Sequence, residues 1–118
     1  MTLLSFNTTV TGDVAVVALD GELDVAGAAL LEHELDRIKA DHAPRALVLD
    51  LSGLVFMDST GLRLVVLADA RAREEGHAFA VVRGAPDVHR VFEITRMSDR
   101  LKILDSAAEA TDLGSASS

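Results

Sequence analysis

Asp58-Ser59-Thr60-Gly61 places a carboxylate beside two hydroxyl groups, just before an apolar helical segment. If Asp58 or Ser59 caps that helix, the Ser59 hydroxyl lies at its amino end and faces solvent. A phosphate on this hydroxyl would meet free backbone amides and a favourable helix dipole, so the fold should tolerate it. It would also add about −1.5 to −2 charges. Without further context, the same four residues are simply a good helix cap.

A second acidic segment, Asp20-Gly21-Glu22-Leu23-Asp24, interrupts an apolar, β-branched run and leads into a predicted helix. Asp24 is expected to cap this helix, since its carboxylate can accept amide hydrogens of the first turn. We expect Asp24 to lie near Asp58, at the end of an adjacent strand. Both carboxylates would repel a phosphate on Ser59 and oppose the attraction of the helix end. A phosphate should therefore change the structure little and the surface charge strongly.

The elements that would position these residues are strands alternating with helices. The predicted order is an edge strand over residues 4–10, a turn at Gly12-Asp13, a buried strand over 14–19, a helix over 25–40, a strand over 46–51, a loop over 52–58, a helix from 59 or 60 to 75, a strand over 78–82, a helix over 86–94, a strand over 101–104 and a helix from Ser106. This order predicts an α/β fold with a mostly parallel mixed β-sheet, an opening antiparallel hairpin and about four α-helices. We expect one domain over residues 1–113 and a flexible tail over residues 114–118.

Local signals support these boundaries. Leu31, Leu35 and Ile38 recur at i, i+4 and i+7, as the buried stripe of a helix does. Gly76 is placed to end the second long helix in a left-handed conformation. In the expected loop, Phe56 and Met57 should anchor the chain against the core rather than contact a partner.

The composition narrows the classes of partner. The chain has 118 residues, a formal charge of −8 and no Trp, Tyr or Cys. Its negative charge repels phosphate backbones and its few aromatic residues offer little base stacking, so nucleic acid is not an expected partner. Without cysteine, disulfide and thiolate chemistry are excluded. No apolar run approaches the roughly 20 residues that span a bilayer, and no secretory signal is visible. We therefore expect a cytoplasmic protein that binds no membrane.

The stretch from Asp50 to Leu62 closely resembles the signature of STAS domains, the family of sulfate-transporter domains and anti-sigma factor antagonists. In the antagonists, a strand ends in a turn like Asp50-Leu51-Ser52-Gly53. A hydrophobic pair follows, and then an Asp-Ser-Ser/Thr-Gly sequence at a helix start, here Asp58 to Gly61. The Gly-Glu-Leu-Asp loop of the family corresponds to residues 21–24. The order of elements matches over residues 4–113.

The resemblance implies an anti-sigma factor antagonist that is not itself an enzyme. In the family, the first hydroxyl residue after the Asp is phosphorylated by a partner that is both serine kinase and anti-sigma factor, which makes Ser59 the acceptor here. The unphosphorylated form would bind that partner and release the sigma factor. The phosphorylated form would not bind, and a serine phosphatase would reset it. No cofactor is implied, since ATP belongs to the partner. The partner-binding residues implied are Asp24, Asp58, Ser59, Thr60, Gly61 and Leu62.

Two of these residues have expected roles beside the acceptor. Gly61 would let the backbone of a partner approach closely and would leave Ser59 uncrowded. Leu62 would either contact the partner or join the core. The chain is expected to be a monomer or to form a weak dimer through its opening edge strand.

Three alternatives compete with this interpretation. The chain could be a STAS scaffold or sensor subunit of a larger signalling assembly, in which Ser59 is never phosphorylated. Asp50 ends a buried strand, like the phosphoaccepting aspartate of response-regulator receivers, but the opening hairpin and the place of Lys102 within the last strand oppose that fold. An enzyme has little support, because no phosphate-binding glycine pattern, catalytic triad or metal-ligand spacing occurs. The four histidines are expected at the surface: His33, His42, His77 and His89.

Overall fold

The structure, a computed structural model, describes residues 3–110 and 113. Its strands form one sheet in the order β1-β2-β3-β4-β5, in which β1 pairs antiparallel with β2 and the other pairs are parallel. The strands are β1 (Ser5–Thr11), β2 (Val14–Leu23), β3 (Ala46–Met57), β4 (Ala78–Val82) and β5 (Ile103–Leu104). The connecting helices are α1 (Val25–His42), α2 (Ser59–Glu75) and α3 (Pro86–Ile94). The expected α/β fold with a mixed, mostly parallel sheet is confirmed.

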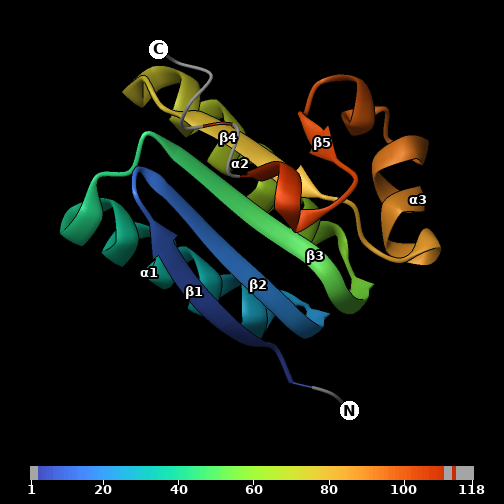
Figure 1. Ribbon diagram of the computed structural model, residues 1–118. Helices are drawn as coiled ribbons and strands as arrows, with labels where there is room; N and C mark the ends of the chain where they lie inside the picture. The colour runs from blue at the N-terminus through green and yellow to red at the C-terminus, as the bar shows by residue number, and fades with distance from the viewer. Residues whose placement is uncertain (1–2, 111–112, 114–118) are drawn as a thin grey trace.

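The hydrophobic core divides into two layers on either side of the sheet. Figure 1 shows α1 and α2 behind the strands, and the larger cluster of buried side chains fills the space between. The predicted stripe of α1 is confirmed, since Leu31, Leu35 and Ile38 are at most 5% exposed. A smaller cluster around Val48 lies on the opposite face, where the 3-10 turn Ala107–Ala110 covers it.

The two central strands run further than the sequence indicates. β2 continues through Asp20 to Leu23, and β3 continues through residues 52–57, the segment expected to be a loop. Their parallel pairing persists as far as Leu23 and Met57, with register shifts after Ala18 and after Gly21. These irregularities break the period of two by which a strand is recognised in a sequence. The expected loop is therefore wrong, because pairing with β2 keeps this segment in the sheet.

The last part of the chain also departs from the prediction. β5 has two residues instead of a strand over 101–104, and residues 3–110 contain three α-helices instead of about four. In place of the helix expected from Ser106, the structure has the 3-10 turn Ala107–Ala110, and residues 111–112 lie outside the described residues. Glu109 Oε2 accepts the Ser106 amide at 2.9 Å, which is half of a capping box. The tail expected over 114–118 also lies outside the described residues.

His89 corrects the expectation that all four histidines lie at the surface, because it is only 8% exposed. It follows the buried Val88 on α3, and its ring centroid lies 6.4 Å from that of Phe92. The buried stripe of α3 consists of Val88 and Phe92. His89 lies next to this stripe, and on so short a helix it is buried together with it.

Glu34 ties the edge strand to α1 through hydrogen bonds. Arg37 donates to both carboxylate oxygens of Glu34 at 2.8 and 2.7 Å, and Thr8 Oγ1 donates to Oε2 at 2.6 Å. These bonds, those from Arg37 above all, lower the pKa of Glu34 from 4.5 to about 2 despite the opposing effect of burial. The ionised carboxylate therefore stabilises the folded chain at neutral pH.

Glu34→Gln is expected to lower the free energy of unfolding by about 1 kcal/mol at pH 7, a modest value because solvent screens the partly exposed Arg37. The pKa of Glu34 is lower in the folded than in the unfolded chain, so the contribution is complete above pH 4.5 and is lost as the pH falls toward 2. Urea unfolding of both proteins at pH 7, 5 and 3 measures the difference. Glu74→Gln, at an exposed position of α2, is the control. A difference that stays constant down to pH 3 would contradict this assignment.

Candidate functional site

Ser59 is the first helical residue of α2, directly after the end of β3. Asp58 caps the helix: its Oδ1 accepts the Gly61 amide at 3.0 Å. The Asp58 amide in turn donates to the Leu23 carbonyl oxygen of β2 at 3.2 Å. One residue thus joins the end of the sheet to the start of the helix. The predicted cap is confirmed, and it is Asp58 rather than Ser59.

The side chain of Ser59 is exposed, whereas that of Thr60 is half-buried. Within the described residues, the Ser59 hydroxyl makes no hydrogen bond. The amides of Ser59 and Thr60 have no partner inside the helix, because the first amides of an α-helix never do. A free hydroxyl thus stands beside free donors and the positive end of the helix dipole, where an added anion would be stabilised.

Asp24 repeats the same arrangement one strand away. It caps α1, with Oδ1 accepting the Gly27 amide at 2.9 Å. Because Leu23 and Met57 are partners in the parallel ladder, Asp24 and Asp58 follow neighbouring strand ends. The expected proximity of these two carboxylates is confirmed. The carboxyl ends of β2 and β3 are therefore followed by two acidic caps and two helix amino ends, and Ser59 belongs to the second of these helices.

Gly61 and Leu62 lie inside the molecule more than the sequence indicates. Gly61 is buried, and a Cβ there would lie 2.7 Å from the Leu23 carbonyl oxygen. The close approach that this glycine permits is to β2 of its own chain, which corrects the expectation that it admits the backbone of a partner. Leu62 is half-buried and packs against the larger core cluster, so it joins the core rather than a free surface.

The end of β3 presents apolar side chains that the sequence analysis assigned differently. Met57 is buried as expected, but Phe56 is 46% exposed and Val55 is 65% exposed. Phe56 pairs with Glu22 across the ladder and turns away from the helices, opposite in direction to Met57. The expectation that Phe56 anchors a loop is therefore wrong, because a continuing strand alternates its side chains between the two faces.

A shallow groove between the amino-terminal halves of α1 and α2 begins beside Ser59. The sequence analysis missed it. Val25, 67% exposed, and Leu67, 38% exposed, contribute apolar surface, and Arg63 and Thr60 line the same groove. Large apolar residues at solvent-facing helix positions were the available signal, but it emerges only once the buried stripes of both helices are known.

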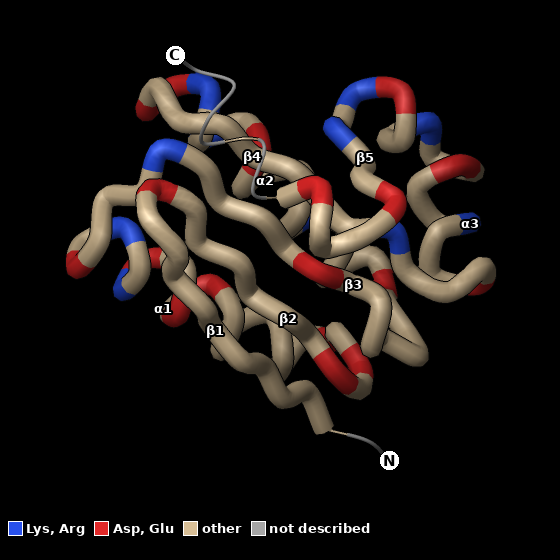
Figure 2. The backbone as a smooth tube through the Cα atoms, viewed as in Figure 1, with Lys and Arg blue, Asp and Glu red and all other residues tan. Residues whose placement is uncertain are grey.

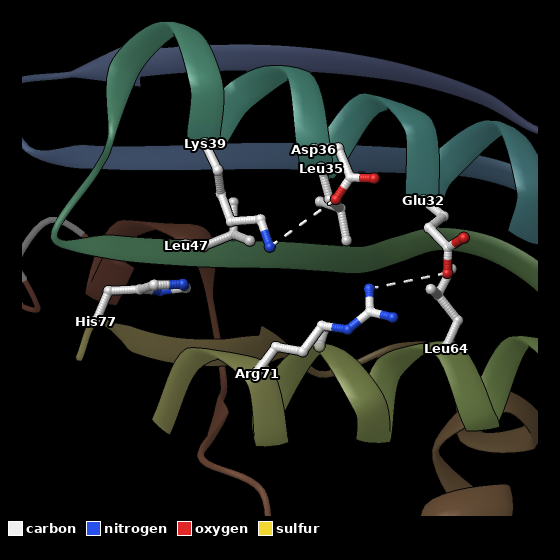
Figure 3. A pocket seen from close by; sticks show the side chains of 9 residues that line it. Glu32, Leu35, Asp36, Lys39, Leu47, Leu64, Arg71 and His77 are labelled. Atoms are coloured by element: carbon white, nitrogen blue, oxygen red, sulfur yellow. Dashed lines mark ion pairs between the residues drawn. The ribbon is translucent and has the colours of Figure 1, made fainter. Parts of the chain in front are cut away.

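A second cavity between α1 and α2 lies nearer their carboxyl ends and is shown in Figure 3. It has a volume of about 10 Å³, which accommodates one water molecule at most. Ion pairs flank it: Lys39 Nζ lies 3.9 Å from Asp36 Oδ1, and Arg71 Nη1 lies 3.9 Å from Glu32 Oε2. This cavity has no room for a substrate. Across residues 3–110 and 113, no three His, Asp or Glu side chains gather as metal ligands would, and no helix is long and apolar enough to cross a membrane.

Comparisons with known proteins agree with the fold. Residues 5–110 match the STAS domain family. The anti-sigma-F factor antagonist RsfB of Mycobacterium tuberculosis is 36% identical over 72 residues, which are 61% of this chain and 58% of that protein. The anti-sigma-B factor antagonist of Staphylococcus aureus is 32% identical over 101 residues, 85% of this chain and 92% of the relative.

A solved structure extends the likeness over nearly the whole chain. The crystal structure of an anti-sigma factor antagonist from Mycobacterium paratuberculosis has a TM-score of 0.82 and 27% identity, and the alignment covers 95% of this chain and 94% of that one. The match to RsfB is shorter and spans less than two thirds of its length. The family match itself extends from β1 to the last 3-10 turn, and it includes both acidic caps and Ser59. The chain belongs to the STAS domain family.

Proposed function

We propose that this chain is an anti-sigma factor antagonist whose binding surface surrounds Ser59. In its unphosphorylated form it binds an anti-sigma factor that is also a serine kinase, and the sigma factor is released. The names of the relatives support this class of function. The observation that carries the proposal is the exposed, unbonded Ser59 hydroxyl, which directly follows the Asp58 cap and lies one strand away from the Asp24 cap.

Phosphorylation of Ser59 is the proposed switch. The kinase transfers the γ-phosphoryl group of ATP to Ser59 Oγ; the bond to the bridging oxygen of ADP breaks, and the hydroxyl proton is released. The phosphate can accept hydrogen bonds from the free backbone amides of the first turn, so α2 should stay folded. A serine phosphatase hydrolyses the phosphoester and restores binding.

The phosphate would act on the partner rather than on the fold. Asp24 and Asp58 already place two carboxylates at this edge, and each uses one oxygen to cap its helix. A phosphate on Ser59 would add about two negative charges beside these carboxylates. When a partner covers this surface the charges lose their solvent, and the repulsion between like charges in such a contact costs several kcal/mol. The groove lined by Val25 and Leu67 adjoins this edge and offers the apolar area that a partner needs.

Substitutions at Ser59 are expected to separate the two forms. Ser59→Ala should bind the anti-sigma kinase of the native host as the unmodified chain does, and Ser59→Asp should bind at least about tenfold more weakly. Titration calorimetry with the purified kinase measures both affinities. Incubation with the kinase and ATP should add the mass of one phosphate to the wild type and none to Ser59→Ala.

Thr60→Ala is the matched control, because it removes the neighbouring hydroxyl from the same turn. It should keep both binding and the single phosphate. Equal affinities for Ser59→Ala and Ser59→Asp, together with no phosphorylated form, would contradict the switch. They would support a constitutive STAS scaffold or sensor subunit in which Ser59 is part of the helix start and is not phosphorylated.

A further inference from the structure

β1 is an edge of the sheet without the features that usually keep edge strands apart. Its seven residues pair with β2 in one continuous register and without a bulge. The chain has no charged residue or proline before Asp13, and Figure 2 shows β1 without charge. Charged side chains, prolines and bulges are the means by which natural edge strands avoid association. The opposite edge, β5, is protected by its length of two residues.

Exposed apolar side chains flank this open edge. Leu3, just before β1, is 76% exposed, and Val10 within β1 is 38% exposed. Leu30 of α1 is 57% exposed and lies one turn before Glu34, whose carboxylate accepts the Thr8 hydroxyl of β1. Unpaired backbone groups and apolar side chains therefore occur together along one side of the molecule.

We propose that β1 pairs antiparallel with β1 of a second copy of this chain, about a two-fold axis at Thr8. In this register Phe6 lies opposite Val10 of the other copy, and aromatic–β-branched pairs of this kind stabilise antiparallel sheets. On the other face of the sheet, Asn7 lies opposite Thr9, so polar side chains meet polar ones. No like charges meet, because β1 has no charge. Five strands from each copy form one continuous sheet.

A second copy suits this edge better than an unrelated strand does. The patch pairs with itself, so the contact is isologous and closes at two copies. Among the described residues, the edges that remain in such a dimer are the two-residue β5 strands, which are too short to pair well with a third copy.

The charges and the functional site are compatible with such a dimer. On α1, Arg37 forms ion pairs with both Glu34 and Asp41, which leaves a single net negative charge among these three side chains. Ser59 follows β3, two strands away from β1. The proposed dimer therefore leaves Ser59 accessible, and its test does not depend on whether Ser59 is phosphorylated.

Charge substitutions on β1 test the dimer directly. Asn7→Lys/Thr9→Lys would place lysines opposite each other twice in the dimer, and Asn7→Glu/Thr9→Glu would do the same with carboxylates. In sedimentation velocity, the mass of the wild type should rise with concentration toward twice 12.5 kDa. The dissociation constant of each variant alone should rise at least about tenfold. An equimolar mixture of the two variants should dimerise again, because every lysine then meets a carboxylate.

Ala70→Lys/Ala107→Lys adds the same charge at exposed positions away from β1 and should dimerise as the wild type does. Circular dichroism confirms that each variant is folded. A wild type that stays at 12.5 kDa at all concentrations would overturn the proposal. So would β1 variants that dimerise as tightly as the wild type, or a mixture that stays monomeric.

Discussion

Gly61→Ala is expected to lower the free energy of unfolding by about 1–3 kcal/mol, the usual cost of overpacking. A Cβ at this position would lie 2.7 Å from the Leu23 carbonyl oxygen and 2.9 Å from Met57 Cγ. The Leu23 oxygen belongs to the backbone of β2 and accepts the Asp58 amide, so it cannot give way as a flexible side chain would. The first turn of α2 must therefore move away from the sheet.

The sign of this effect makes the test decisive. At an ordinary helix position, replacing glycine by alanine stabilises the helix by up to about 1 kcal/mol. Urea unfolding of Gly61→Ala should instead show a loss, whereas Glu74→Ala on the exposed side of α2 should change little. A Gly61→Ala protein as stable as the wild type would show that α2 does not lie this close to Leu23. Displacement of the turn should also slow phosphorylation of Ser59.

The helix starts could be predicted because their signals are local. Asp24 and Asp58 each precede an apolar helical segment, and a capping carboxylate needs only the amides of the next turn. Gly76 ends α2 in a left-handed conformation with φ of 80°, and a glycine after a helical segment is the usual sequence signal for this conformation. Pro86 likewise marks the first turn of α3. The structural role of each of these residues depends only on neighbours within four positions along the chain.

The strand ends could not be predicted, because their cause is pairing between distant residues. Gly53 lies in β3, and a Cβ there would meet the Leu19 carbonyl oxygen of β2 at 2.6 Å. In the sequence, Gly53 has the appearance of a turn residue; in the sheet, it permits a close contact between two backbones. The same holds for Gly21, whose φ of 96° accompanies a register shift within β2. Phe56 and Gly61 were misplaced for this reason, since their surroundings depend on where the strands end.

Leu23→Ala is expected to lower the free energy of unfolding by about 2–5 kcal/mol, more than Gly61→Ala does. Leu23 is fully buried at the end of β2, and its backbone oxygen receives the Asp58 amide. Its side chain packs beneath Gly61, so a cavity at this place removes support from the first turn of α2. Beyond the loss of stability, the turn that presents Ser59 should loosen.

Leu31→Ala is the matched control, since Leu31 is also fully buried in the same core cluster but lies in the middle of α1. Both variants should lose comparable stability in urea unfolding, because the same atoms leave similarly buried sites. Hydrogen exchange should differ: amides in the first turn of α2 should exchange faster in Leu23→Ala than in Leu31→Ala. Phosphorylation of Ser59, measured under conditions in which both variants remain folded, should slow only in Leu23→Ala. Equal rates of phosphorylation and exchange in the two variants would mean that the core beneath Gly61 stabilises the fold without positioning the acceptor.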